Sequence, residues 1–247
     1  MGNHTIKAII PALWQDDSTV TAAFSTKPDS GYIENDYSLA YSEYRQDRII
    51  EQNRRDWLRE LGLGHTGLAL GKQVHGSEVK IVTDAIFQND TDGLVTHVKN
   101  LTLGILVADC AAVLLADRSN GIISAVHAGW RGAISGIIGN AIKKMTSLGG
   151  DLTQVEAFVS PCISLQAFEV GKEVAQRFPD EYVDYHSYDK PHINLKAFLV
   201  RELTKSGLTE SNIESHEACT VGRPESFHSF RRDKEKSGRM MAVISLG

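Results

Sequence analysis

Three short segments of the sequence carry histidine, cysteine or arginine at points where a buried strand is expected to end. They are 73–76 (Gln-Val-His-Gly), 108–110 (Ala-Asp-Cys) and 127–132 (His-Ala-Gly-Trp-Arg-Gly). Residues in the loops at strand ends are positioned by a rigid scaffold and often perform the chemistry of a protein. His75, Cys110 and His127 are therefore the first candidates for a functional site.

A predicted hairpin brings two of these segments together. An Asn-Gly pair interrupts the apolar stretch 113–126 and favours a tight turn, because this pair tolerates positive φ. A two-residue turn places His127 opposite Leu114, whereas a four-residue loop places it opposite Ala112. In both registers Cys110 and His127 emerge at the same end of the hairpin.

One cysteine with two histidines is the composition of a catalytic zinc site. Three protein ligands leave the fourth tetrahedral position open, and zinc lowers the pKa of a bound water to about 7. His75, which follows an expected strand over 67–74, would complete the set with Cys110 and His127. Two other interpretations stay open. One is a Cys110 thiolate activated by a histidine, and the other is a small buried cysteine beside histidines that only end strands.

A glycine-rich turn next to His127 favours anion binding. Segment 129–132 is expected to open a helix that ends near Leu148, so free N–H groups at the helix start and the Arg131 guanidinium could hold an anion. A tight strand-to-helix turn would need the same glycines, and this alternative stays open. A second basic and aromatic segment, 227–233, is explained more simply as a solvated charged loop.

Hydrophobic periodicity predicts the elements that must position these side chains. The predicted strands are 19–24, 67–74, 101–107, 113–117, 121–126, 155–159 and 241–245, with a turn-rich segment at 26–31. The predicted helices are 47–61, 134–145 and one that begins after the N-cap Asn194 and includes Leu203. Because strands and helices do not alternate strictly, we predict a mixed α/β fold with mixed sheets.

Composition is that of an ordinary globular protein. The chain has 247 residues, and 42% of them are hydrophobic. Its formal net charge of −5 argues against nucleic-acid binding, because nucleic-acid-binding proteins normally have a surplus of basic residues. No apolar run approaches the ~18 residues of a membrane span, and residues 1–7 have no signal-peptide pattern. Three cysteines do not make a disulfide framework. We predict one domain over 1–247, in the cytoplasm, without nucleic-acid or membrane partners.

Nine segments, taken together and in order, carry a family resemblance. They are 72–76 (KQVHG), 91–96 (TDGLVT), 107–110 (VADC), 125–132 (AVHAGWRG), 161–163 (PCI), 168–170 (FEV), 219–220 (CT), 230–233 (FRRD) and 238–239 (GR). In these segments the chain resembles the YfiH family, also called multicopper polyphenol oxidoreductase or laccase-domain proteins and laccase-domain-type purine nucleoside phosphorylases. The resemblance extends from about residue 20 to the C-terminus, which is nearly the whole chain.

The resemblance implies a fold, a metal site and an activity. The implied fold has two mixed sheets flanked by helices and is similar to the catalytic domain of a deamidating bacterial toxin. The implied zinc ligands are His75, Cys110 and His127. The implied activity is phosphorolysis of adenosine, inosine, guanosine and methylthioadenosine, together with adenosine deamination, so purine nucleosides and phosphate are the expected partners. Asp109 is a candidate for proton transfer, or it only anchors the turn.

Four residues are candidate contacts for phosphate or substrate. Arg131 is the preferred anion contact, and Gln73 and Arg232 are further candidates. Lys27 stands where the family usually has arginine. A lysine can hold phosphate as a point charge but lacks the bidentate fork of arginine.

Three rival functions stay open. Copper-dependent polyphenol oxidation needs more histidine ligands than this trio offers. A metal-free Cys–His hydrolase with Cys110 as nucleophile could act in peptidoglycan editing. A metal-stabilised binding module would have no turnover. The metal content of the purified protein separates the zinc enzyme from the metal-free hydrolase. Whether the chain is a monomer or a homodimer stays open.

Overall fold

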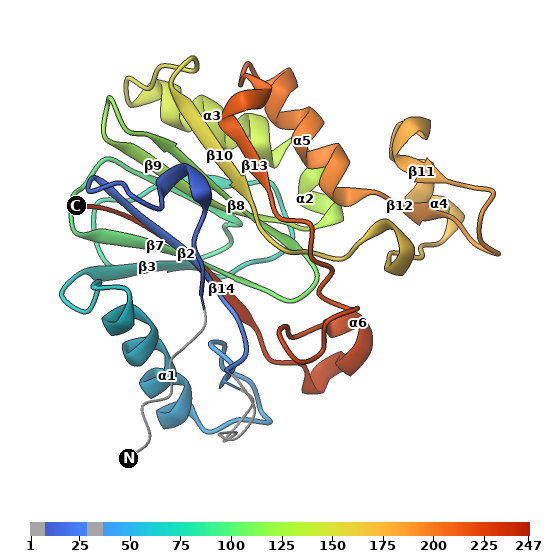
Figure 1. The fold of residues 1–247 in the computed structure, drawn as a ribbon, viewed down its shortest axis with the longest axis horizontal. Coiled ribbons are helices and arrows are strands. Elements are labelled where there is room, and N and C mark those ends of the chain that lie inside the picture. The colour runs from blue at the N-terminus through green and yellow to red at the C-terminus, as the bar shows by residue number, and fades with distance from the viewer. Residues whose placement is uncertain (1–7, 29–36) are drawn as a thin grey trace.

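Two six-stranded β-sheets pack face to face at the centre of the structure, a computed structural model that describes residues 8–28 and 37–247 (Figure 1). The strand order of the first sheet is β1 (Ala8–Ile9), β2 (Val20–Ser25), β14 (Met240–Leu246), β7 (Leu101–Val107), β3 (Gly67–Gly71) and β5 (Phe87–Gln88). The strand order of the second sheet is β13 (Ile213–Ser215), β10 (Val155–Val159), β8 (Ala111–Asp117), β9 (Ile122–Ala128), β6 (Gly93–Thr96) and β4 (Val79–Ile81). Each sheet contains parallel and antiparallel pairs, which confirms the predicted mixed α/β fold.

Helices cover the outer face of each sheet. The α-helices are α1 (Asp47–Glu60), α2 (Trp130–Ile134), α3 (Ile137–Ser147), α4 (Lys172–Ala175), α5 (Leu195–Lys205) and α6 (Phe230–Asp233). Short 3₁₀ helices are η1 (Ala12–Trp14), η3 (Leu165–Ala167), η4 (Asp180–Tyr182), η5 (Glu210–Asn212) and η6 (Lys234–Lys236). A two-stranded ribbon, β11 (Val183–Asp184) with β12 (His192–Ile193), lies with α4 in an arm at the right of Figure 1.

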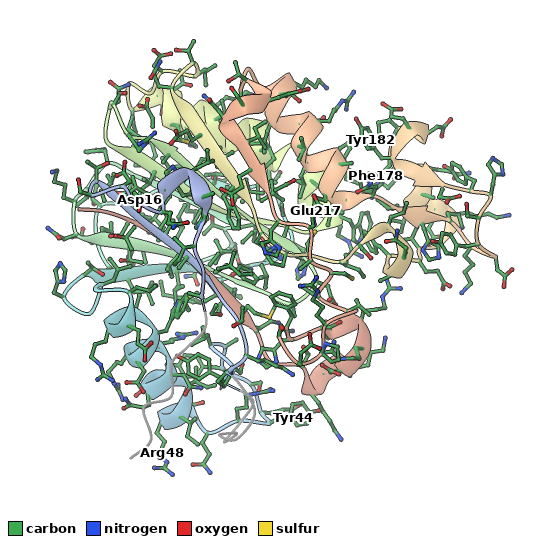
Figure 2. The ribbon with its side chains drawn as sticks, viewed as in Figure 1. Asp16, Tyr44, Arg48, Phe178, Tyr182 and Glu217 are labelled. Carbon is green, nitrogen blue, oxygen red and sulfur yellow. The ribbon has the colours of Figure 1, made fainter. Side chains whose placement is uncertain are left out.

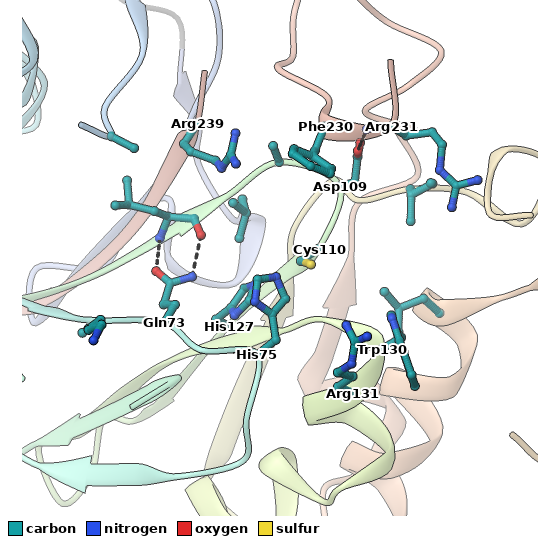
Figure 3. Close-up of a pocket in the computed structure, with 18 of the residues that line it drawn as sticks. Gln73, His75, Asp109, Cys110, His127, Trp130, Arg131, Phe230, Arg231 and Arg239 are labelled. Carbon is teal, nitrogen blue, oxygen red and sulfur yellow. Dashed lines mark hydrogen bonds between the residues drawn. The ribbon is translucent and has the colours of Figure 1, made fainter. Parts of the chain in front are cut away.

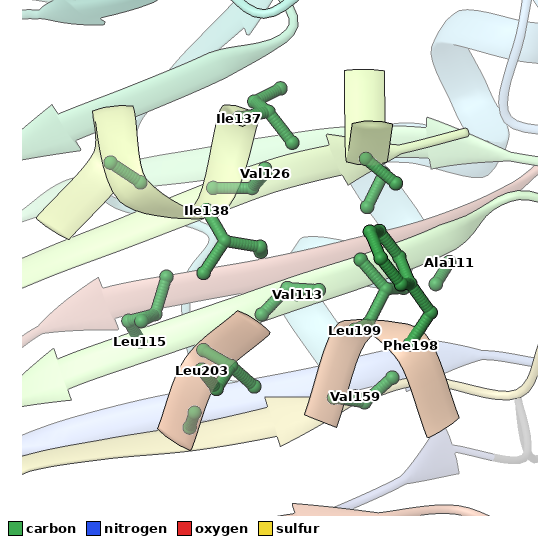
Figure 4. Packing of buried hydrophobic residues seen from close by; sticks show 14 of the residues in the cluster. Ala111, Val113, Leu115, Val126, Ile137, Ile138, Val159, Phe198, Leu199 and Leu203 are labelled. Carbon is green, nitrogen blue, oxygen red and sulfur yellow. The ribbon is translucent and has the colours of Figure 1, made fainter. Parts of the chain in front are cut away.

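The alternation of side chains between the two faces of each sheet explains how sheets and helices are layered. Side chains of successive residues point to opposite faces of a sheet, so a strand that is apolar throughout is buried on both faces. In β8, Leu114 belongs to the core between the sheets, whereas Val113 and Leu115 belong to the core under α3 and α5. Figure 4 shows this second core, in which Ile138 and Leu203 pack toward β8 and β9.

The remaining layers follow the same rule. On the outer face of the first sheet, Met241 and Val243 pack with Trp57 of α1, whose side chain is fully buried. At the base of the arm, Phe178 and Tyr182 (Figure 2) lie edge-to-face against the Phe198 ring of α5, with centroid distances of 5.0 and 5.6 Å. The order of layers is thus α1, first sheet, second sheet, and α3 with α5.

Most predicted elements are confirmed, with two differences that matter for the site. Strands 101–107 and 155–159 have the predicted bounds, and the Asn194 side chain accepts a hydrogen bond from the N–H of Ala197 as the predicted helix cap. Strand β3 ends at Gly71 instead of residue 74. The predicted single helix from Gly129 to Leu148 is wrong. It is divided into α2 and α3, because Gly136 between them adopts a left-handed φ of 81°.

Two predicted features concern residues that the structure does not describe. Residues 29–31 of the predicted turn, and the N-terminal residues 1–7 in which we predicted no signal peptide, lie outside the described residues. Among the helices that are described, none is both long enough and apolar enough to cross a bilayer.

The connections between the sheets create the site. Residues 108–110 carry the chain from β7 in the first sheet to β8 in the second, so Cys110 lies at an end of the sandwich. The β8–β9 hairpin has a four-residue loop and pairs Ala112 with His127, which is the second of the two predicted registers. The 72–76 segment after β3 reaches the same end of the sandwich.

Two glycines in helices give a test of this packing. An added Cβ at Gly132 would lie 2.5 Å from the carbonyl oxygen of Gly76, whereas an added Cβ at Gly139 meets nothing within 4 Å. Gly139→Ala should raise the free energy of unfolding by about 0.5–1 kcal/mol, because alanine loses less backbone entropy on folding. Gly132→Ala should lower the free energy of unfolding by about 1–3 kcal/mol. Urea denaturation measures both, and a loss of stability in both variants would contradict this packing.

Candidate functional site

His75, Cys110 and His127 lie together at the end of the sandwich (Figure 3). Their ligand atoms all lie within 4.8 Å of one another. The two imidazole rings are 4.7 Å apart between centroids and nearly perpendicular, at 83°. Within residues 8–28 and 37–247, this trio is the one group of three or more histidine, cysteine or acidic side chains arranged to hold a metal ion.

The geometry of the trio fits a metal ion. Zinc–ligand bonds of about 2.0–2.3 Å place two ligands of a tetrahedral ion roughly 3.3–3.8 Å apart, so small side-chain rotations would complete the coordination. The backbone at Gly129 leaves the space that the ligands need. An added Cβ there would lie 2.9 Å from Cys110 Sγ and 3.3 Å from His75 Cδ2. A glycine is therefore required beside the candidate metal position.

A buried carboxylate, that of Asp92, orients two of the three candidate ligands. Asp92 Oδ1 lies 2.7 Å from His127 Nδ1 and accepts a 2.9 Å hydrogen bond from the N–H of His75. Asp92 Oδ2 accepts hydrogen bonds from the N–H groups of Val74 (3.1 Å) and Gly76 (2.7 Å), and the Asp92 carbonyl accepts one from the N–H of His127 (2.7 Å). A carboxylate on Nδ1 fixes the histidine tautomer and leaves Nε2 to bind a metal.

The turn that presents His75 is held in a conformation that non-glycine residues rarely adopt. His75 has a φ of 60°, and the three N–H groups of residues 74–76 all point at Asp92. Two residues before His75 and two residues after the end of β3, the side chain of Gln73 bonds to the backbone of strand β7. Gln73 Nε2 donates to the Leu106 carbonyl (2.7 Å), and Gln73 Oε1 accepts from the Leu106 N–H (2.9 Å). Gln73 lines the pocket as predicted for a substrate contact, but its amide is engaged with the β7 backbone.

The electrostatics of the trio favour an ionised cysteine. Burial by itself would raise the pKa of Cys110, but the charge of His127 and hydrogen bonds from His127 and His75 lower the pKa to about 6. Burial likewise opposes the charged form of His127, but the Cys110 thiolate and the Asp92 carboxylate raise the pKa of His127 to about 9. Cys110 and His127 therefore form a thiolate–imidazolium pair when no metal is present.

Asp109 joins the cysteine turn to the C-terminal part of the chain. It has a φ of 79°, and its carboxylate accepts hydrogen bonds from Thr220 Oγ1 (2.7 Å), Ser229 Oγ (3.1 Å) and the Arg231 N–H (2.6 Å). These contacts make Asp109 an anchor for the turn. Its role in proton transfer stays a prediction.

The trio opens into a cavity of about 670 Å³, well within the usual size range of small-molecule sites. Aromatic side chains that line the cavity are Tyr41, Phe87, Trp130, Phe168 and Phe230. Cationic side chains that line it are Arg54, Lys72, Arg131, Arg231, Lys234 and Arg239. Flat aromatic surfaces and positive charge together suit a planar ligand that carries or meets an anion.

Arg131 lies in this pocket, as predicted, but the helix around it is short. Its guanidinium carbon is 4.4 Å from the centroid of the Trp130 ring. Helix α2 has five residues, so its macrodipole is small and the expected contribution of the helix start is not supported. The anion contact rests on the Arg131 side chain itself.

Lys27 and Arg232 lie elsewhere. Both line a neighbouring hollow of about 430 Å³ and neither lines the pocket of the trio. The Arg232 guanidinium donates to the carbonyls of Thr220, Val221 and Phe227 and pairs with Asp233 at 2.8 Å. These bonds fix Arg232 in a structural position and turn it away from the pocket. Phosphate binding by Lys27 stays a prediction.

The other two cysteines stand apart from the trio. Cys162 and Cys219 are partners in a short parallel bridge between chain segments. Cys162 is fully buried, and burial raises the pKa of its thiol to about 12. Neither thiol belongs to the candidate metal cluster.

Reasoning from the sequence did not identify Asp92 as a site residue. Among the cationic side chains that line the pocket, it identified only Arg131. Asp92 stands inside the motif 91–96 that carried part of the family resemblance, which is the signal that could have identified it. Arg239 stands in another such motif, 238–239. Arg54 lies at the helical spacing of the apolar Ile50 and Trp57, and a charged residue on that apolar face is the signal that could have identified it.

Replacement of Asp92 by asparagine tests its orienting role. Asp92→Asn should lower the metal affinity of the trio about 10–100-fold, because loss of a carboxylate partner of a ligating histidine has that effect. Asp90→Asn is the matched control, since Asp90 is an exposed residue two positions earlier that contacts Lys72 at 3.7 Å. Competition with a chromogenic chelator measures the affinity. Equal affinities in the two variants would contradict an orienting role for Asp92.

The ionisation of Cys110 gives a second test. In protein stripped of metal, the lowered pKa means that Cys110 is a thiolate above about pH 6. Alkylation of Cys110 by iodoacetamide, followed by peptide mass spectrometry, should therefore rise with a midpoint near pH 6 and be fast at pH 7. Cys162, with its raised pKa, should stay unmodified in the folded protein. A Cys110 midpoint near the ordinary thiol value of about 8.5 would contradict the thiolate–imidazolium pair.

Comparison with known proteins relates this site to a family. The family model described as "Multi-copper polyphenol oxidoreductase laccase" matches residues 21–247. A protein from Deinococcus radiodurans named purine nucleoside phosphorylase is 31% identical over 243 residues, which cover 96% of this chain and 93% of that protein. A protein of an unidentified prokaryote named adenosine deaminase RL5 is 28% identical over 202 residues, which cover 75% and 77% of the two chains.

Solved structures agree in fold. The YfiH protein of Bacillus licheniformis superposes with a TM-score of 0.89 at 24% identity, over 98% of this chain and 97% of that one. YlmD of Geobacillus stearothermophilus superposes with a TM-score of 0.85 at 22% identity, over 98% of each chain. The match over residues 21–247 and the relatives above 30% identity show that the chain belongs to the multi-copper polyphenol oxidoreductase laccase family, as its motifs indicated.

Proposed function

We propose that the protein is a zinc-dependent purine nucleoside phosphorylase that also deaminates adenosine. The observation that carries this proposal is the His75–Cys110–His127 cluster at the base of an aromatic and cationic pocket. The names of the relatives support the substrate class, since they include purine nucleoside phosphorylase and adenosine deaminase.

In phosphorolysis the pocket residues would bind and orient two reactants. Aromatic side chains of the pocket would stack on the purine, and Arg131 would hold hydrogenphosphate beside C1′ of the ribose. A phosphate oxygen forms the bond to C1′, the C1′–N9 bond breaks, and its electron pair stays on the purine. The proton of hydrogenphosphate ends on the purine, so the products are the free base and ribose 1-phosphate.

The metal site belongs to the same proposal. His75, Cys110 and His127 would hold zinc, because one thiolate and two imidazoles suit zinc better than hard cations. Zinc supplies Lewis-acid activation when bound there. Asp92 would keep the His127 ring oriented, with Nε2 toward the metal. In deamination, water adds at C6 of the purine and ammonia leaves, with proton transfer assigned to Asp109.

We assign one catalytic domain to residues 1–247, and nucleosides and phosphate as partners. A cytoplasmic location suits Cys110, because a reducing compartment keeps a metal-binding thiol reduced.

A second candidate function has one observation in its favour. The lowered pKa of Cys110 beside an imidazolium is also the arrangement of a cysteine hydrolase nucleophile. Such an enzyme would work without metal and would be inactivated by alkylation of Cys110. Retained activity after metal removal would favour this hydrolase over the zinc enzyme.

Product analysis tests the proposed function directly. With adenosine and phosphate, mass spectrometry should detect adenine and ribose 1-phosphate, and omission of phosphate should abolish both. Inosine should form with and without phosphate, as the product of deamination. Absence of all three products with zinc-loaded enzyme would refute the proposed function.

Alanine variants of the three candidate metal ligands test whether turnover depends on the trio. His75→Ala, Cys110→Ala and His127→Ala should each lose bound zinc and turnover, because the site has no ligand to spare. The double variant Cys162→Ser/Cys219→Ser is the matched control and should keep about one zinc per chain and measurable phosphorolysis. Loss of zinc from a folded control, checked by circular dichroism, would contradict an open three-ligand site.

A further inference from the structure

Four arginines of the pocket wall each lie against an aromatic ring that lines the same pocket. The pairs, with guanidinium carbon to ring centroid distances, are Arg131 on Trp130 (4.4 Å), Arg54 on Tyr41 (4.6 Å), Arg239 on Phe230 (5.6 Å) and Arg231 on Phe168 (5.8 Å). A ring beneath the guanidinium plane restricts the side chain and leaves N–H donors at its edge for a ligand. The pocket therefore presents several arginines that are already oriented.

The charge of this wall exceeds what one phosphate neutralises. Six cationic side chains line the pocket, although the whole chain has a net charge of −5. Among the described lining residues the one carboxylate is Asp109, which already accepts three hydrogen bonds. Lys72 has a partner outside the pocket, Asp90. A phosphate group carries about −1.5 to −2 at pH 7, so once Asp109 and Asp90 are counted, a single phosphate leaves about two of the six positive charges unbalanced.

Two of these arginines share one wall of the pocket, and Arg131 lies on the other side of the trio (Figure 3). Arg54 and Arg239 share one wall through Leu39, whose carbonyl accepts from Arg54 Nε (2.7 Å) and whose N–H donates to the Arg239 carbonyl (3.0 Å). In Figure 3, Arg239 and Arg131 lie on opposite sides of Cys110. Two separate cationic positions therefore flank the candidate reaction centre.

From this arrangement we infer that the pocket holds two phosphate groups at once and that purine nucleoside 5′-monophosphates are its preferred substrates. The inference rests on the proposed function. Arg131 holds the attacking phosphate at C1′, and the wall of Arg54 and Arg239 holds the 5′-phosphate. C1′ and the C4′ that carries the 5′-group lie on either side of the ring oxygen, which matches cationic positions on two sides of the centre.

The reaction on a nucleotide has the same balance as on a nucleoside. For adenosine 5′-monophosphate (AMP), an oxygen of hydrogenphosphate forms the bond to C1′ while the C1′–N9 bond breaks. The electron pair and the proton of hydrogenphosphate end on the purine. The products are adenine and ribose 1,5-bisphosphate.

The test compares AMP with adenosine on the zinc-loaded enzyme at saturating phosphate. The value of kcat/KM should be about tenfold or more higher for AMP, since a charge-assisted contact to the 5′-phosphate adds to binding. Arg54→Gln should remove this preference while keeping a donor for the Leu39 carbonyl. Arg55→Gln, the next residue on the exposed face of α1 with a side chain 62% exposed, is the matched control and should keep the preference. Arg239→Gln, with its melting temperature recorded, provides a second variant of the same wall.

The outcomes separate this inference from the proposed function. Equal or lower kcat/KM for AMP at saturating phosphate would overturn the second phosphate position, and a preference seen only at low phosphate would do the same, because the two anions would then share one site. Isothermal titration calorimetry of AMP and adenosine measures binding without turnover. If neither is cleaved, the proposed function fails. Tighter binding of AMP that Arg54→Gln removes would then still support the 5′-phosphate position, and equal binding would refute it.

Discussion

The Asp92 carboxylate is the contact on which the site depends. It is fully buried, and an ionised carboxylate away from water is stable only when its oxygens are hydrogen-bonded. Here they accept from three consecutive N–H groups at residues 74–76 and contact the His127 ring. Residues 74–76 follow β3 of the first sheet, whereas His127 lies in β9 of the second. The trio therefore assembles only when the two sheets are packed and Asp92 is ionised.

Around this contact the pocket combines opposite charges in a small space. The Cys110 thiolate lines the pocket, the buried Asp92 carboxylate contacts the lining residue His127, and arginines from α1, α2 and the C-terminal segments line the wall. The chain as a whole has a net charge of −5, so the six cationic side chains of this pocket are a local concentration of positive charge. Aromatic rings under the arginines serve two purposes, since they restrict the guanidinium groups and offer flat surface to a purine.

The sequence predicted the parts of the fold and site that depend on local pattern. Continuous apolar runs identified strands 101–107 and 155–159, and polar residues at strand ends identified His75, Cys110 and His127. The division of the helix at Gly136 was missed, because a glycine in a periodic apolar pattern is compatible with one helix or two. Asp92 and Arg54 were missed because their roles come from contacts between segments far apart in the chain. The bonds of Arg232 to the carbonyls of Thr220 and Phe227 likewise come from the folded chain and have no signal in the local sequence.

The central claim is that this trio holds one zinc ion with an open coordination position. The most direct measurement is metal analysis of protein purified without added metal, followed by X-ray absorption at the edge of the metal found. We predict about one zinc per chain, with one sulfur ligand near 2.3 Å and nitrogen ligands near 2.0–2.1 Å. Protein that is fully active without metal, or that contains copper in place of zinc, would contradict the account.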